Sequence, residues 1–172
     1  DVETEVVYLQ FHGVNASANV ILNGKSVCTH DGGYSTFRVD VTKDLQEDNS
    51  IVIEVDNSVN DRVYPQKADF TFYGGIYRDV EILVVSKEHF DLDYYGGPGM
   101  KYVTEVFGKD AKVKVTTYVN ETAKASNTIV KVELTDAEGK VVATAEGLET
   151  ELSIANVHLW DGVADPYLYT VE

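Results

Sequence analysis

The sequence has almost no cysteine and lacks any long hydrophobic stretch. Cys28 is the only cysteine, so no disulfide bond can form within the chain. No apolar stretch approaches the roughly 20 residues that a membrane-spanning helix needs. A signal-peptide pattern is also absent, which does not decide between a periplasmic, a secreted and a cytoplasmic protein.

Basic residues are scarce as well. The chain has 14 of them against 29 acidic residues, which gives a formal net charge of −15. Such a surface repels the phosphates of nucleic acids and of anionic lipids, so we expect neither a nucleic acid nor a membrane as a partner. Hydrophobic residues make up 44% of the chain, an ordinary share for a globular protein.

No segment keeps a helical periodicity over three turns. Short segments typical of strands recur instead, at spacings of about 8–12 residues. Asn23-Gly24, between two of them, is a strong hairpin signal. The segments lie at 7–11, 20–22, 25–28, 34–39, 51–56 and 76–85, and then at 89–94, 102–107, 113–119, 128–135 and 141–145. The sequence predicts an all-β chain of two β-sandwich domains, residues 1–87 and 88–172.

Signatures of catalytic and metal sites are missing too. There is no Ser-His-Asp set, no phosphate-binding glycine-rich loop and no nucleotide-binding fingerprint. The histidines lack the spacing of zinc ligands, and Asp91-Leu92-Asp93 begins like a calcium loop without the further oxygen ligands. We predict no metal and no cofactor. Asn15-Ala16-Ser17 matches a glycosylation sequon, which we attribute to chance.

One long segment, residues 57–75, shows no clear periodicity. Loops longer than about 12–15 residues are usually either functional or disordered. The aromatic residues Tyr64, Phe70, Phe72 and Tyr73 favour an ordered functional loop. It ends at Gly74-Gly75, where glycine permits a turn or a close approach of the backbone, and then enters a strand. We expect this loop to hold one shape at the surface.

The end of this loop also carries a resemblance. Asp69-Phe70-Thr71-Phe72-Tyr73-Gly74-Gly75-Ile76-Tyr77-Arg78-Asp79-Val80 resembles the end of the sugar-binding domain of glycoside hydrolase family 2, the β-galactosidase and β-glucuronidase family. Segments 7–14, 20–25, 30–37 and 40–42 are similar to earlier parts of that domain. Segments 157–160 and 165–171 are similar to the end of the following immunoglobulin-like domain.

The resemblance implies a jelly-roll domain without its N-terminal strands, followed by an immunoglobulin-like sandwich without its last strand. It also implies that the catalytic (β/α)₈ barrel lies outside this chain. On this interpretation the chain is a non-catalytic accessory region that buttresses the barrel of an enzyme hydrolysing terminal β-glycosides, with galactose as the first choice of sugar. The alternatives are a stand-alone carbohydrate-binding module and a purely structural, adhesin-like pair of sandwiches.

No catalytic residue is expected in the chain itself. In the family, an Asn-Glu pair at the end of a barrel strand supplies the general acid. Asn120-Glu121 resembles that pair but follows a predicted sandwich strand, and no partner carboxyl can be placed about 5–5.5 Å away, as a retaining glycosidase requires. We therefore predict that the isolated chain is inactive.

Four residues are candidates for substrate binding. By its offset from Gly75, Asp69 matches the aspartate with which the family's domain reaches the catalytic pocket, and a carboxylate accepts strong hydrogen bonds from sugar hydroxyls; its alternative role is to cap a turn. Arg78 either binds sugar or braces the loop. Tyr73, like the other aromatic residues of the loop, either stacks on a pyranose face or packs against the barrel. His30, in a glycine-rich turn, either faces a ligand or is solvated.

The predicted partners are a terminal β-linked sugar, bound through the parent enzyme, and the catalytic barrel. We also expect self-association, because a sandwich without its first strands leaves sheet edges uncovered.

Overall fold

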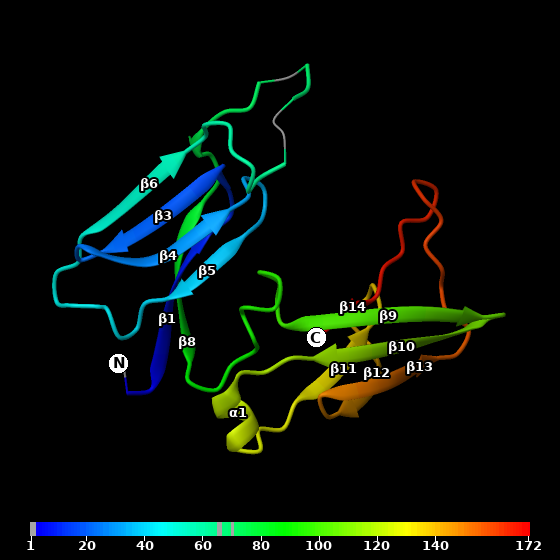
Figure 1. Ribbon diagram of the computed structural model, residues 1–172. Coiled ribbons are helices and arrows are strands. Elements are labelled where there is room, and N and C mark those ends of the chain that lie inside the picture. Colours follow the sequence, from blue (N-terminus) through cyan, green and yellow to red (C-terminus); the bar gives the residue numbers. More distant parts are fainter. Residues whose placement is uncertain (1–2, 65–66, 70) are drawn as a thin grey trace. The chain divides into compact units, whose positions relative to one another are not determined.

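The computed structural model describes residues 3–64, 67–69 and 71–172. The chain forms two compact units, residues 1–97 and 98–172, both built almost entirely of strands (Figure 1). The predicted all-β fold with two β-sandwiches is confirmed. The division falls after Gly97, whereas the sequence had suggested a junction after Lys87. Among the described residues, no helix has the length and hydrophobicity to cross a membrane.

The first unit contains two three-stranded antiparallel sheets. Strands β5 (Phe37–Asp40), β1 (Glu5–Phe11) and β8 (Val80–Ser86) form one in that order, and β4 (Lys25–Asp31), β3 (Ser17–Leu22) and β6 (Ile51–Asp56) form the other. A short ladder joins β2 (Val14–Asn15) to β7 (Gly75–Ile76).

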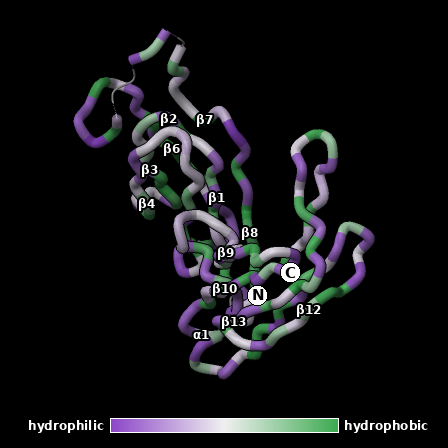
Figure 2. Tube along the Cα trace, turned by 90° about the vertical axis from the view of Figure 1, so that its right-hand side faces the viewer, coloured by the Kyte–Doolittle hydropathy of each residue, from purple (hydrophilic) through white to green (hydrophobic). Residues whose placement is uncertain are grey.

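Side-chain alternation explains why these strands form a sandwich. In β3, Ala18, Val20 and Leu22 are buried while the residues between them are half-buried. They pack in one core with Leu9 and Phe11 of β1. Figure 2 shows a run of hydrophobic residues along β8 as well. The predicted hairpin after β3 is confirmed, because Asn23 and Gly24 both have positive φ and connect β3 directly to β4.

The second unit repeats the two-sheet plan. Its sheets are β13 (Glu149–Ile154), β10 (Asp110–Thr117) and β9 (Met100–Phe107), and β12 (Val141–Glu146), β11 (Lys131–Thr135) and β14 (Thr170–Val171). Val115, Val132, Leu134 and Leu152 are at most 2% exposed and form its core.

A short helix, α1 (Glu121–Ala125), follows β10 in the second unit. Asn120 caps it, since its side-chain oxygen accepts a hydrogen bond from the Ala123 amide at 3.0 Å, and Glu121 pairs with Lys124 at 2.6 Å. Asn120-Glu121 is therefore the start of a helix with an exposed carboxylate.

Three expectations about strands differ from the structure. The strand expected at 89–94 is wrong: Arg38 donates hydrogen bonds to the carbonyls of Leu92 and Gly97, so this segment lies on the first unit without forming a ladder. Strand β13 was missed, although Leu152 and Ile154 alternate with polar residues and pair with β10. The strand expected from Ile76 is interrupted after β7 and resumes at Val80.

Strand β8 forms one edge of its sheet and exposes apolar side chains. Val80, Ile82 and Val84 are 45%, 65% and 55% exposed. They lie opposite Phe11, Leu9 and Val7 in the ladder, so they belong to the face of the sheet that carries the core. This edge thus combines exposed hydrophobic surface with a strand backbone to which another strand can pair.

We expect the 172-residue chain to self-associate through this edge. Replacing Ile82 with lysine should weaken association at least tenfold, because it places a charge in the apolar row. Light scattering over a concentration series measures the association of the wild-type chain and of the variant. Thr144→Lys, at an exposed position of β12, adds the same charge elsewhere and serves as the control. A wild-type chain that stays monomeric at millimolar concentration contradicts this expectation.

Candidate functional site

The loop 57–75 connects β6 to β7, and its return is shaped by two glycines. Gly75 has φ +96°, a conformation that strains any residue with a side chain. Gly74 lies so close to Asn57 that an added Cβ would be 2.6 Å from the side-chain amide nitrogen of Asn57. A turn and a close approach, the two uses expected of this pair, thus occur side by side.

Asn15 holds the returning arm of the loop in place. Its side chain is 3% exposed, and its amide nitrogen donates a hydrogen bond to the Tyr73 carbonyl at 2.7 Å. Gly33 makes room for it, because a Cβ at that position would clash with the Asn15 side chain. The sequence showed Asn15 only as part of a sequon, and its burial rules out an attached glycan in this fold. The signal that could have identified it is its position directly after Gly13-Val14, at the end of a segment similar to the family.

Tyr77 and Arg78 join the loop exit to neighbouring turns. The Tyr77 hydroxyl donates to the Gly33 carbonyl at 2.6 Å. The Arg78 guanidinium donates to the carbonyls of His12 and Tyr34 at 3.3 and 3.2 Å, and it lies 5.2 Å from the centre of the Tyr77 ring. These contacts are those of a brace, the second of the two roles considered for Arg78.

Tyrosine side chains gather around this brace. The rings of Tyr34 and Tyr64 stack at 6.0 Å, and Tyr77 meets Tyr34 edge-on at 6.1 Å. A depression of about 200 Å³ is lined by Asn15, Tyr34, Thr71, Tyr73 and Tyr77. With 74% of its surface exposed, Tyr73 is free to meet a ligand or another protein surface. Phe70, another candidate for stacking, lies outside the described residues.

Asp69 is an exposed residue of the same loop, two positions before Thr71 of the depression. Its carboxylate is therefore available to accept hydrogen bonds from a ligand outside this unit. The residues that line the depression include hydroxyls, an amide and aromatic faces but no carboxylate. This chemistry suits contact with a polyhydroxylated ring, and it does not supply the pair of carboxyls that glycoside hydrolysis requires.

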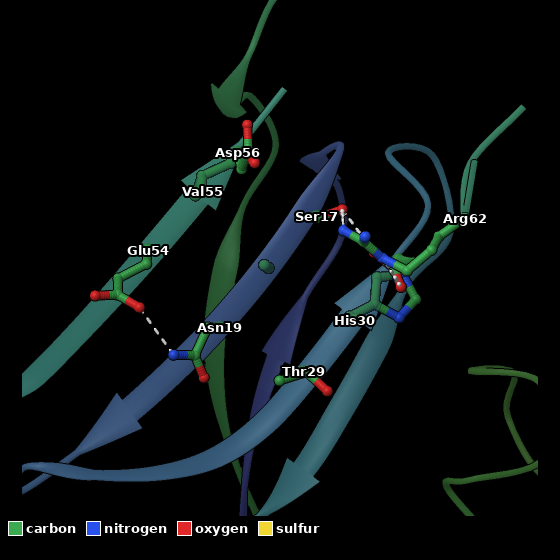
Figure 3. A pocket seen from close by; sticks show the side chains of 10 residues that line it. Ser17, Asn19, Thr29, His30, Glu54, Val55, Asp56 and Arg62 are labelled. Carbon is green, nitrogen blue, oxygen red and sulfur yellow. Dashed lines mark hydrogen bonds and ion pairs between the residues drawn. The ribbon is translucent and has the colours of Figure 1, made fainter. Parts of the chain in front are cut away.

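His30 lies in a different depression, of about 510 Å³, on the sheet that contains β3, β4 and β6 (Figure 3). Its Nε2 atom is 3.1 Å from both the Gly32 carbonyl and the Ser35 hydroxyl, and its ring stacks on Phe37 at 4.1 Å. The structure thus places Tyr73 on the depression beside the Tyr77–Arg78 brace, leaves Asp69 exposed earlier in the same loop, and gives His30 partners of its own.

Within the described residues, no three histidine, cysteine or acidic side chains gather as a metal-binding group. In the segment that began like a calcium loop, the Asp91 carboxylate accepts a hydrogen bond from the Asp93 amide at 2.8 Å and so closes a turn.

Comparisons with known proteins match the whole chain. Residues 1–98 match the family model described as "Glycosyl hydrolase 2 galactose-binding domain-like", and residues 99–172 match that described as "Glycosyl hydrolases family 2". A β-glucuronidase of Bacteroides fragilis is 31% identical over 96% of this chain and 26% of its own length. A β-galactosidase of Thermoanaerobacterium thermosulfurigenes is 30% identical over 98% of this chain and 22% of its own length.

Solved structures give the same answer. The crystal structure of an FMN-binding β-glucuronidase from Faecalibacterium prausnitzii L2-6 has a TM-score of 0.87 and 34% identity, and it covers 97% of this chain and 26% of that one. A putative β-galactosidase from Bacteroides fragilis has a TM-score of 0.88 and 30% identity, covering 99% of this chain and 28% of that one. The chain spans about a quarter of the length of these relatives.

Proposed function

The chain belongs to glycosyl hydrolase family 2, and from that premise we propose that it is a non-catalytic accessory region of a glycoside hydrolase. Its role is to support a catalytic barrel elsewhere in the whole protein and to lend the loop 57–75 to the sugar site. The observation that carries this proposal is the construction of the loop. Asn15 and Arg78 hold its exit, while Asp69 and Tyr73 remain exposed.

Each candidate residue then has a distinct task. Asp69 accepts hydrogen bonds from sugar hydroxyls, which a charged acceptor binds about twice as strongly as a neutral one does. Tyr73 offers an aromatic face to the pyranose or to the barrel. Arg78 maintains the position of the loop through the carbonyls of His12 and Tyr34. His30 is satisfied within its own turn and serves the fold.

The reaction of the whole protein is the hydrolysis of a terminal β-glycoside. β-Galactosides and β-glucuronides are the two substrate classes that the relatives' names suggest. Because Asp69 recognises hydroxyls, which both sugars carry, residues outside this chain choose between them. Recognition of a glucuronide would also require a cationic side chain that binds the carboxylate of the sugar.

A panel of nitrophenyl glycosides tests this proposal. We expect the protein encoded by the complete gene to cleave one β-glycoside of the panel, and the 172-residue chain alone to cleave none. Turnover by the purified chain that is abolished by Glu121→Gln would show that the chain itself is catalytic. A complete protein that is folded and cleaves nothing would contradict the enzymatic role.

The tyrosine-lined depression favours a second function, that of a carbohydrate-binding module. Tyr34, Tyr73 and Tyr77 supply aromatic faces without any other part of the enzyme. This alternative predicts that the isolated chain binds galactose or glucuronate at millimolar concentration or below. A titration followed through the amide resonances of residues 71–77 decides the matter, since unchanged resonances at high sugar concentration reject it.

A further inference from the structure

The outgoing arm of the loop 57–75 is tied to the sheet by an ion pair. Arg62 Nε is 3.1 and 3.2 Å from the two carboxylate oxygens of Asp31 on β4. Arg62 Nη2 is 3.2 Å from the Ser17 hydroxyl on β3, and that hydroxyl donates to Asp31 at 2.6 Å. Figure 3 shows the Arg62 side chain reaching from the loop across to Ser17.

Local turns present Arg62 to these partners. The Asn60 side-chain oxygen accepts hydrogen bonds from the backbone amides of Arg62 and Val63 at 2.9 and 3.3 Å. The Asp56 carboxylate, where β6 ends, accepts one from Ser58 at 2.8 Å. Side chains of this kind that bind the backbone two residues on are a common way to fix a turn. The arm is therefore shaped before its guanidinium reaches the sheet.

The returning arm has a separate anchor, the hydrogen bond from Asn15 to the Tyr73 carbonyl. Asp69 lies between the two anchors. The contacts at Arg62 and at Tyr73 therefore both act on the loop that carries Asp69.

We propose that Arg62, Asp31 and Ser17 form a latch that holds the loop in the shape in which Asp69 meets the sugar. Arg62 is then a positioning residue of the reaction, which it influences through Asp69. The inference rests on the proposed function, because it presumes that Asp69 contacts the substrate.

The charge state of the latch supports this role. The hydrogen bond from Ser17, together with Arg62, holds the pKa of Asp31 below its usual value, so the carboxylate stays ionised at neutral pH. Arg62 and Asp31 are also 55% and 38% exposed as side chains, and breaking such a pair uncovers little of the core. The latch can be removed while the sandwich remains folded.

A double-mutant cycle in the protein encoded by the complete gene tests the latch. We expect Arg62→Gln to lower kcat/KM about three- to tenfold, because only part of the loop population then has the binding shape. In an Asp69→Ala background the same substitution should cause no further loss. Arg62→Lys should retain more of the wild-type kcat/KM than Arg62→Gln does. Lys112→Gln, which breaks a comparable exposed pair with Glu151 in the second unit, should leave kcat/KM unchanged.

Amide hydrogen exchange provides a readout that does not depend on catalysis. In the 172-residue chain, Arg62→Gln should accelerate exchange at residues 58–64 and 71–75 at least threefold and leave the amides of β1 unchanged. Wild-type exchange together with wild-type kcat/KM in this variant would overturn the latch.

The outcomes separate the two proposals. A harmless Asp69→Ala substitution contradicts the assignment of Asp69 to the sugar site in the proposed function, and with it the positioning role of the latch. A damaging Asp69→Ala combined with a neutral Arg62→Gln contradicts the latch alone. An Arg62→Gln loss that persists in full in the Asp69→Ala background means that Arg62 acts by another route, which also overturns the latch.

Discussion

Replacing Asp69 with alanine in the protein encoded by the complete gene is expected to lower kcat/KM for its β-glycoside by about 10- to 150-fold. A hydrogen bond to a charged group contributes about 1.5–3 kcal/mol, and each 1.4 kcal/mol corresponds to a factor of ten. Asp69→Asn should lose less, since its amide keeps one acceptor oxygen. Initial rates below KM measure the effect on the glycoside identified by the panel.

The control for this prediction is Asp61→Ala. Asp61 is an exposed carboxylate of the same loop, so its removal changes the charge equally. We expect less than a twofold change, because electrostatic steering by one exposed charge is weak at physiological ionic strength. Equal losses in the two variants would indicate a general charge effect, and a normal rate in folded Asp69→Ala would remove Asp69 from the sugar site.

Much of the fold was predictable because its signals are local. Alternation places Ala18, Val20 and Leu22 on one face of β3, and Asn23-Gly24 readily adopts the positive φ values that a two-residue hairpin requires. The turn and the close approach at Gly74-Gly75 could be predicted for the same reason. Strand β13 also carried a local signal, its alternation of Leu152 and Ile154 with polar residues, and was nevertheless missed.

What could not be predicted depends on contacts between distant segments. Gly33 is small because Asn15 lies against it, and nothing near Gly33 in the sequence indicates this. The segment 89–94 has the composition of a strand, yet its carbonyl at Leu92 bonds to Arg38 rather than to a neighbouring strand. Arg62 and Asp31 likewise form a pair across the sheet that neither local sequence suggests.

The same contrast applies to the candidate site. Asp69, Tyr73 and Arg78 were identified through one continuous stretch, and both Asp69 and Tyr73 are exposed in the structure. The residues that hold them, Asn15 among them, come from other strands and could be recognised only in three dimensions. A motif thus identifies the parts of a site that face outward more readily than the parts that support them.

The support of the site begins in the core, and Phe11→Ala is expected to have the largest effect on stability. Phe11 is fully buried, and its ring stacks on that of Phe37 at 4.8 Å. Removing such a side chain costs about 3–5 kcal/mol, because the apolar contacts are lost and a cavity remains. That is a large part of the about 5–15 kcal/mol that stabilises a typical domain.

The loss should be confined to the first unit and should reach the site. Phe11 ends β1, just before the segment that carries Asn15, so a weakened β1 loosens the anchor of the returning loop arm. Because a chain of two units need not unfold in one step, hydrogen exchange at the individual amides of β1, β3 and β5 is the appropriate measurement. We expect it to accelerate at least 100-fold, the rate ratio that corresponds to about 3 kcal/mol. Val142→Ala, at an exposed position of β12, should change exchange by less than threefold, and equal exchange in the two variants would show that Phe11 does not hold this core together.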